Sequence, residues 1–319
     1  MNSVLRRKAA RRDVAGYTIV DRDLSRTAYR GTIVLSCIFH MIMRANNQYY
    51  RTSCGARFDR FAANSSFHNG MIRALVFSIV YLLGSGVNAV DDSAVDYIEV
   101  ETGVAPEYAV IWLHGLGADG NDFRPLVPEL AIPGQFAVRF VFPHAPYRAI
   151  TINGGMVMRG WYDIASTDIA GREDAAGIEA SAAIVAQLIA EQQQRGIASD
   201  HIILAGFSQG GAIALFAGVR HAQPLGGILA LSAYMPLPGR VAAERHLANR
   251  DIAIFMAHGQ YDPVVPLALG ESSRDALTNM GYRIEWQTYP MQHSVSIEEI
   301  QDIGVWIRQR LFESLSRSQ

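Results

Sequence analysis

From about residue 95 onward, the chain alternates between two apolar patterns. Short runs that are apolar throughout predict strands at residues 108–113, 138–142, 201–205, 227–232, 252–257 and 284–289. Alanine-rich amphipathic stretches predict helices at residues 177–195, 210–220, 266–280 and 296–315. Strands without an exposed polar side are typical of a sheet covered on both faces. Because a turn and then a helix tend to follow each strand, the pattern predicts a mostly parallel sheet in an α/β fold.

The first ninety residues show no comparable period. Within them, residues 74–90 form a stretch of 17 residues without a charge, at the lower limit of a membrane-spanning helix, which needs about 17–25 residues. Three interpretations stay open for this region. The region is a signal peptide starting at Met71, a membrane anchor, or a stretch that is either an over-extended gene start or a poorly folded extension.

Charge divides the chain at the same point. Residues 1–90 carry 13 basic and 4 acidic side chains, an excess of nine positive charges. Residues 91–319 carry the other 15 basic and 26 acidic side chains, an excess of eleven negative charges. Both cysteines, Cys37 and Cys54, lie in the first part. We therefore predict a basic N-terminal extension at 1–90 and a second domain at 91–319.

The composition excludes several classes of protein. Half of the 319 residues are hydrophobic and 18% are charged, which excludes a disordered chain. The net charge of −2 and the pI near 6.5 give no general attraction to nucleic acid, so no such partner is expected. Two cysteines cannot build a disulfide framework or a structural zinc site.

The sharpest chemical signal is the sequence GFSQGG at residues 206–211. It lies between the predicted strand 201–205 and the predicted helix 210–220, and G-x-S-x-G at such a junction is typical of a nucleophile elbow. The sharp turn strains the serine backbone, and Gly206 and Gly210 remove side chains that would clash with the adjoining elements. Ser208 is therefore the predicted nucleophile.

A serine hydroxyl attacks well only when a base takes its proton. In this architecture the acid and then the base follow the serine along the chain. Asp262 follows the predicted strand 252–257, and His293 follows the predicted strand 284–289, so both should share the edge of the sheet that holds Ser208. We predict Asp262 as the orienting acid and His293 as the general base. His258 precedes the acid and breaks this order.

The oxyanion formed in acyl transfer needs backbone N–H donors. One donor is predicted at Gln209, the residue after the nucleophile. The other is predicted at Leu116, in the turn HGLG that follows the strand 108–113. This chemistry requires no metal and no cofactor, and neither is predicted.

At these residues the chain resembles the phospholipase/carboxylesterase family of α/β-hydrolases, which includes acyl-protein thioesterases and small bacterial carboxylesterases. The matching motifs are VIWLHGLG at 110–117, FPHAP at 142–146, TINGGM at 151–156, GWYDI at 160–164, GFSQGG at 206–211, HGQYD at 258–262 and YPMQH at 289–293. The resemblance implies the same triad and oxyanion hole. It covers residues from about 97 to 311 and leaves out 1–90. Gln292 is a departure, since the family often has glycine there.

The stretch 151–164 is the predicted wall of the substrate pocket. Met158 and Trp161 would supply adaptable apolar surface there, and Val265, close to Asp262, would face an acyl chain. The resemblance implies a shallow apolar groove without a large lid. It also implies a cytoplasmic protein, unless residues 71–90 export or anchor it, and it is compatible with a homodimer.

Two functions are then compared. The favoured hypothesis is a serine hydrolase that cleaves carboxylic esters or acyl thioesters through an acyl-enzyme intermediate. Its substrate would be a small-molecule ester or an acylated molecule. The rival is a non-catalytic hydrolase-like binding module, tethered to a membrane if residues 74–90 are an anchor.

Overall fold

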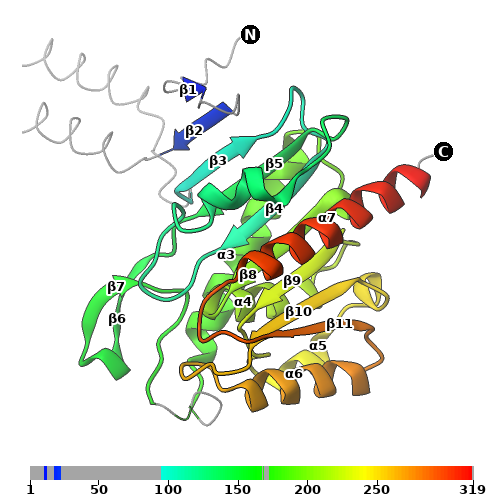
Figure 1. Ribbon diagram of the computed structural model, residues 1–319. Coiled ribbons are helices and arrows are strands. Elements are labelled where there is room, and N and C mark those ends of the chain that lie inside the picture. Colours follow the sequence, from blue (N-terminus) through cyan, green and yellow to red (C-terminus); the bar gives the residue numbers. More distant parts are fainter. Residues whose placement is uncertain (1–10, 13–17, 23–94, 167, 169–171, 318–319) are drawn as a thin grey trace, which may run out of the picture. The chain divides into compact units, whose positions relative to one another are not determined.

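The computed structural model of the chain describes residues 11–12, 18–22, 95–166, 168 and 172–317. Its centre is a nine-stranded sheet with the strand order β1-β2-β3-β5-β4-β8-β9-β10-β11 (Figure 1). Residues 71–90 lie outside the described part of the chain, so the three interpretations of that segment stay predictions.

The sheet is mostly parallel. Its strands are β1 (Arg11–Arg12), β2 (Thr18–Arg22), β3 (Tyr97–Glu101), β4 (Tyr108–Leu113), β5 (Val138–Pro143), β8 (Ile202–Phe207), β9 (Gly227–Leu231), β10 (Ile254–Gly259) and β11 (Ile284–Tyr289). Neighbouring strands from β5 through to β11 pair in parallel. The pairs β1–β2, β2–β3 and β3–β5 are antiparallel. Residues 18–22 therefore extend the β3 edge, and the division of the chain at residue 90 stays a prediction.

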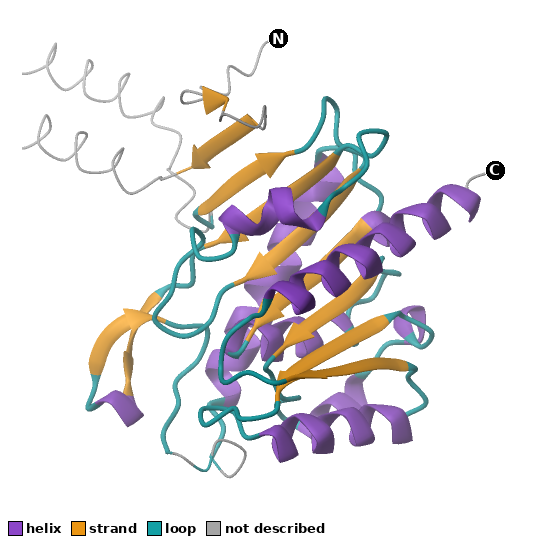
Figure 2. Cartoon of the chain, in the orientation of Figure 1, coloured by secondary structure: helices purple, strands orange, loops and turns teal. Residues whose placement is uncertain are grey.

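Helices cover both faces of the sheet (Figure 2). They are α3 (Ala175–Gln194), α4 (Gln209–Gly218), α5 (Pro238–Glu244), α6 (Leu267–Asn279) and α7 (Ile297–Arg317), with 3-10 turns η1 (Arg124–Leu130), η2 (Thr151–Asn153), η3 (Ser199–His201) and η4 (Leu247–Asn249). Apolar side chains of α3 to α6 form one core with the sheet, and those of η1 and α7 form the other. In β4, Ile111 belongs to the first core and Trp112 to the second. Burial on both faces explains why the strands are apolar throughout.

The expected α/β-hydrolase fold is confirmed. Strands β4 and β11 have the predicted bounds, and the other predicted strands and helices are present with ends shifted by one or two residues. The sequence reasoning missed β3, α5, η1 and the separate antiparallel hairpin of β6 (Tyr147–Ile150) and β7 (Met156–Arg159).

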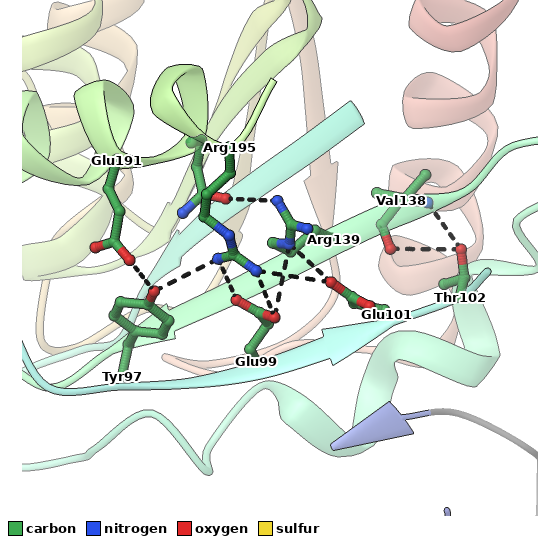
Figure 3. Close-up of polar contacts among 9 residues, drawn as sticks. Tyr97, Glu99, Glu101, Thr102, Val138, Arg139, Glu191 and Arg195 are labelled. Atoms are coloured by element: carbon green, nitrogen blue, oxygen red, sulfur yellow. Dashed lines mark hydrogen bonds and ion pairs between the residues drawn. The ribbon is translucent and has the colours of Figure 1, made fainter. Parts of the chain in front are cut away.

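Strand β3 was missed because its glutamates are paired with arginines distant in the sequence (Figure 3). Glu99 is 3% exposed. Its two carboxylate oxygens accept from the guanidinium of Arg195 at 2.5 and 2.9 Å. Glu101 accepts from Arg139 at 2.9 Å. Tyr97 donates its hydroxyl proton to the carboxylate of Glu191, in α3. This network ties β3 to β5 and to the end of α3.

Two searches of the described residues were negative. None of their helices combines the length and the apolar character that crossing a membrane requires. Their His, Cys, Asp and Glu side chains also form no group of three or more that could hold a metal ion.

Candidate active site

The predicted nucleophile Ser208 sits in the sharp turn between β8 and α4. Its backbone has φ 54° and ψ −121°, a strained conformation for a residue with a side chain. A Cβ on Gly206 would lie 2.3 Å from the Gly210 backbone, and one on Gly210 would lie 2.3 Å from the Leu113 carbonyl oxygen. Both glycines are therefore required by close backbone approach, which explains the spacing of the motif. Ser208 is 9% exposed.

The predicted acid and base are joined by a hydrogen bond. His293 Nδ1 lies 2.7 Å from Asp262 Oδ2, and the Asp262 side chain is fully buried. The other carboxylate oxygen accepts from the backbone N–H groups of Val264 and Val265, at 2.8 and 2.9 Å. If Nδ1 carries the proton of this bond, Nε2 is left as a proton acceptor. The arrangement can therefore orient a neutral imidazole as a base.

The structure brings this pair beside the elbow but does not complete a triad. Phe207, the residue before Ser208, places its ring centroid 4.7 Å from that of His293. Among the hydrogen bonds of the described residues, His293 bonds to Asp262 and not to the Ser208 hydroxyl. Catalytic hydrogen bonds are often long without substrate and tighten when it binds. The serine–imidazole contact accordingly stays a prediction.

A second histidine, His258, also approaches the Asp262 carboxylate. Its Nε2 is 3.6 Å from Asp262 Oδ2 and 2.8 Å from the Val265 carbonyl oxygen. Burial lowers the pKa of His258, so a neutral imidazole is favoured that donates to Val265. The sequence reasoning set His258 aside because it precedes the acid, and only the fold reveals its contact with that acid.

The two segments that carry the predicted oxyanion donors both adjoin Ser208. Gln209 is the first residue of α4, where backbone N–H groups have no partner inside the helix. Leu116 follows Gly115, and a Cβ on Gly115 would lie 3.6 Å from the Ser208 Cβ. The turn that carries Leu116 therefore packs directly against the nucleophile.

The predicted pocket residues differ in exposure. Met158 is half-buried, and its sulfur would lie 3.7 Å from a Cβ on Gly117, beside the Leu116 turn. Trp161 is fully buried and Val265 is 3% exposed. Their polar contacts are with the protein itself, because the Trp161 indole N–H donates to the His114 carbonyl at 2.8 Å and the Val265 N–H donates to the acid. That Trp161 and Val265 contact the substrate stays a prediction. Their burial within the protein does not favour it.

Comparisons with known proteins identify the family of the chain. Residues 96–311 match the phospholipase/carboxylesterase family. Acyl-protein thioesterase 1 of Neurospora crassa is 41% identical over 219 residues, which are 66% of this chain and 89% of that protein. The enzyme of the same name from Mycosarcoma maydis is 36% identical over 225 residues, 66% of this chain and 94% of that protein.

Solved structures agree with this result. The crystal structure of Arabidopsis thaliana SOBER1 superposes with a TM-score of 0.61 at 27% identity, covering 64% of this chain and 99% of that one. Zea mays acyl-protein thioesterase 2 superposes with a TM-score of 0.57 at 26% identity, covering 65% of this chain and 94% of that one. The chain thus belongs to the phospholipase/carboxylesterase family and is a hydrolase with the α/β-hydrolase fold.

Proposed function

We propose that the protein is a serine hydrolase of carboxylic esters and acyl thioesters. Ser208 Oγ attacks the substrate carbonyl while His293 Nε2 takes the hydroxyl proton, and the Leu116 and Gln209 N–H groups stabilise the oxyanion. The C–O or C–S bond breaks as His293 returns the proton to the leaving group, which leaves an acyl-enzyme. His293 then takes a proton from water, whose oxygen attacks the acyl carbon, and returns that proton to Ser208 Oγ as the acyl–Oγ bond breaks, which releases the acid and restores the serine.

The single observation that carries this proposal is the hydrogen bond of 2.7 Å between His293 and the buried Asp262 carboxylate, beside the elbow. A buried carboxylate that holds an imidazole in one tautomer beside a strained serine is the arrangement that activates a serine. A hydrolase-like binding module has no need of this arrangement, so the bond favours the enzyme over the rival.

Two observations support an acyl chain as part of the substrate: the names of the relatives and the apolar surface around Met158. The curated relatives are named acyl-protein thioesterases. Met158 lies beside the turn of the oxyanion donor, and its neighbours Met156 and Val157 are 63% and 64% exposed. This apolar surface suits an acyl chain better than a charged or sugar group. The cytoplasmic location and a homodimer stay predictions.

The proposal is tested with Ser208→Ala. We expect this variant to lose nearly all hydrolysis of a p-nitrophenyl ester and of an S-acyl peptide, and to lose labelling by a fluorophosphonate, while its melting temperature stays near that of the wild type. Ser232→Ala is the matched control, because Ser232 also follows a parallel strand with a positive φ, 45°. Undiminished turnover or labelling in Ser208→Ala would refute the proposal.

A further inference from the structure

The side chain of Gln209 is used entirely within the protein. It is 2% exposed. Its Oε1 accepts from the Trp161 backbone N–H at 2.7 Å, and its Nε2 donates to the Tyr162 carbonyl at 2.6 Å. The Gln209 side chain thus bonds both the N–H of residue 161 and the carbonyl of residue 162. Because Gln209 also carries a predicted oxyanion donor, these bonds fix the start of α4 against residues 161–162.

Residues 161–162 also contact the segment that carries the other predicted donor, Leu116. The Trp161 indole N–H donates to the His114 carbonyl at 2.8 Å, and the Trp161 carbonyl accepts from the Ser181 hydroxyl. The Tyr162 hydroxyl is hydrogen-bonded to that of Tyr234 at 2.9 Å. Residues 161–162 are therefore immobilised from several directions and span the distance from the elbow to the end of β4.

His114 carries the connection to the Leu116 turn. Its Nδ1 lies 2.7 Å from the Gly115 carbonyl, and its Nε2 lies 3.0 Å from the Ala145 backbone N–H. One tautomer of a neutral imidazole satisfies both contacts, with Nδ1 as donor and Nε2 as acceptor. Burial lowers the pKa of His114 to about 4, so this neutral form persists through the neutral range.

We propose that Gln209, Trp161 and His114 form a brace that sets the separation of the two oxyanion donors. The inference rests on the proposed function. An oxyanion hole acts only when both donors lie about 2.7–3.1 Å from the oxygen they stabilise. Here one donor starts a helix and the other lies in a turn after a different strand, and the brace is a continuous hydrogen-bonded link between them. The three are positioning residues, and Trp161 acts through His114 rather than on substrate.

The test uses Gln209→Leu and Trp161→Phe. Gln209→Leu keeps the backbone N–H and removes both side-chain hydrogen bonds, and Trp161→Phe keeps an aromatic ring and removes the bond to His114. We expect each to lower kcat for a p-nitrophenyl ester about ten- to a hundredfold, with KM changed less than about threefold, since a misplacement of about 1 Å costs up to that factor. Active sites are counted by fluorophosphonate titration, so that unfolded protein does not enter kcat.

Gln192→Leu is the matched control. Gln192 is also a fully buried helical glutamine, and its Oε1 accepts from Arg139 at 3.2 Å, in the network tied to β3. We expect this variant to melt at a lower temperature with kcat per active site within about twofold of the wild type. A similar loss of kcat in all three variants would assign the effect to general destabilisation and overturn the brace.

A second readout separates positioning from folding. A trifluoromethyl ketone forms an oxyanion adduct with the serine, so its Ki should rise in Gln209→Leu and Trp161→Phe by about the factor lost in kcat/KM. An unchanged Ki, or a kcat within twofold of the wild type in either variant, overturns the proposal. If Gln209→Leu does not fold, Trp161→Phe decides. Normal turnover of these variants beside an inactive Ser208→Ala would reject the brace alone, whereas an active Ser208→Ala would reject the proposed function.

Discussion

A buried carboxyl outside the candidate site is expected to give a measurable pH dependence of stability. Glu299, in the first turn of α7, is completely buried. Among the described residues, neither of its carboxylate oxygens has a hydrogen-bond partner. Burial raises the pKa of Glu299 to about 8, and the nearby charge of Asp302 adds to the rise. The carboxyl is therefore protonated at neutral pH in the folded protein, and we expect Glu299→Gln, which copies the neutral form, to stabilise the fold.

The magnitude follows from the two pKa values. In the unfolded chain the carboxyl loses its proton near its ordinary pKa of 4.5, whereas the folded protein keeps the proton until about pH 8. Between these values the folded state binds more protons, so stability falls as pH rises. At about 1.36 kcal/mol for each pH unit, the loss is about 3 kcal/mol at pH 7 and roughly 5 kcal/mol above pH 8. Below pH 4.5 the loss vanishes.

Urea unfolding of wild type and Glu299→Gln at pH 4.5, 6, 7 and 8 measures this dependence. The stability gained by the variant should be near zero at pH 4.5 and should grow with each step. Glu298→Gln is the control, because Glu298 is the adjacent carboxyl and is exposed; its gain should stay small at every pH. A gain for Glu299→Gln that is the same at all four pH values would refute the assignment of a raised pKa.

Two further perturbations test the buried charges and the brace histidine. Arg195→Met should destabilise the fold by about 3 kcal/mol, because it removes the two-point partner of the buried Glu99; urea unfolding should show part of this loss restored in the Glu99→Gln/Arg195→Met double variant, and no restoration would contradict the pairing. The contribution of His114 to wild-type stability should fall as pH drops from about 6.5 to about 4, since the unfolded chain takes up a proton that buried His114 refuses. Glu299 acts with the opposite sign in this range, so the contribution is measured as the difference between wild type and His114→Asn. In His114→Asn this part of the acid slope should disappear, and an unchanged slope in urea unfolding between those pH values would contradict it.

Most of the sheet could be predicted from the sequence because its strands are uniform. Strands such as β4 and β8 are buried on both faces, and a run of apolar residues between turns is then sufficient evidence. Strand β3 could not be found in this way. Its sequence YIEVE alternates apolar and acidic residues, and a sequence pattern cannot reveal that Arg195 and Arg139 would cover the acidic side. Hairpin β6–β7 was missed for the opposite reason, since apolar residues such as Val157 are exposed.

In the candidate site, too, chain order could be read from the sequence, whereas contacts between buried side chains could not. Ser208, Asp262 and His293 could be predicted as a set because each follows a strand that ends at one edge of the sheet, a property of chain order and topology. The contacts of Trp161 and His258 depend on which side chains become buried together, and chain order carries no information on that. An aromatic residue in a glycine-rich loop therefore suggested a pocket wall, whereas its indole N–H is bonded to His114.

Two buried carboxyls near this edge show how local backbone decides which of them can serve the site. Asp262 accepts two backbone N–H bonds from its own turn and a third from His293, so its charge is solvated without water. Glu299 has a sequence context, Ser296-x-x-Glu, that favours a reciprocal capping box. Only half of that box forms. The Ser296 hydroxyl accepts from the Glu299 N–H at 3.2 Å, and the buried carboxyl has no hydrogen-bond partner within the described part of the chain. The turn after β10 therefore gives both oxygens of its carboxylate a hydrogen-bond donor, whereas the first turn of α7 holds a neutral acid, and we expect only the former to stabilise a positively charged imidazole during turnover.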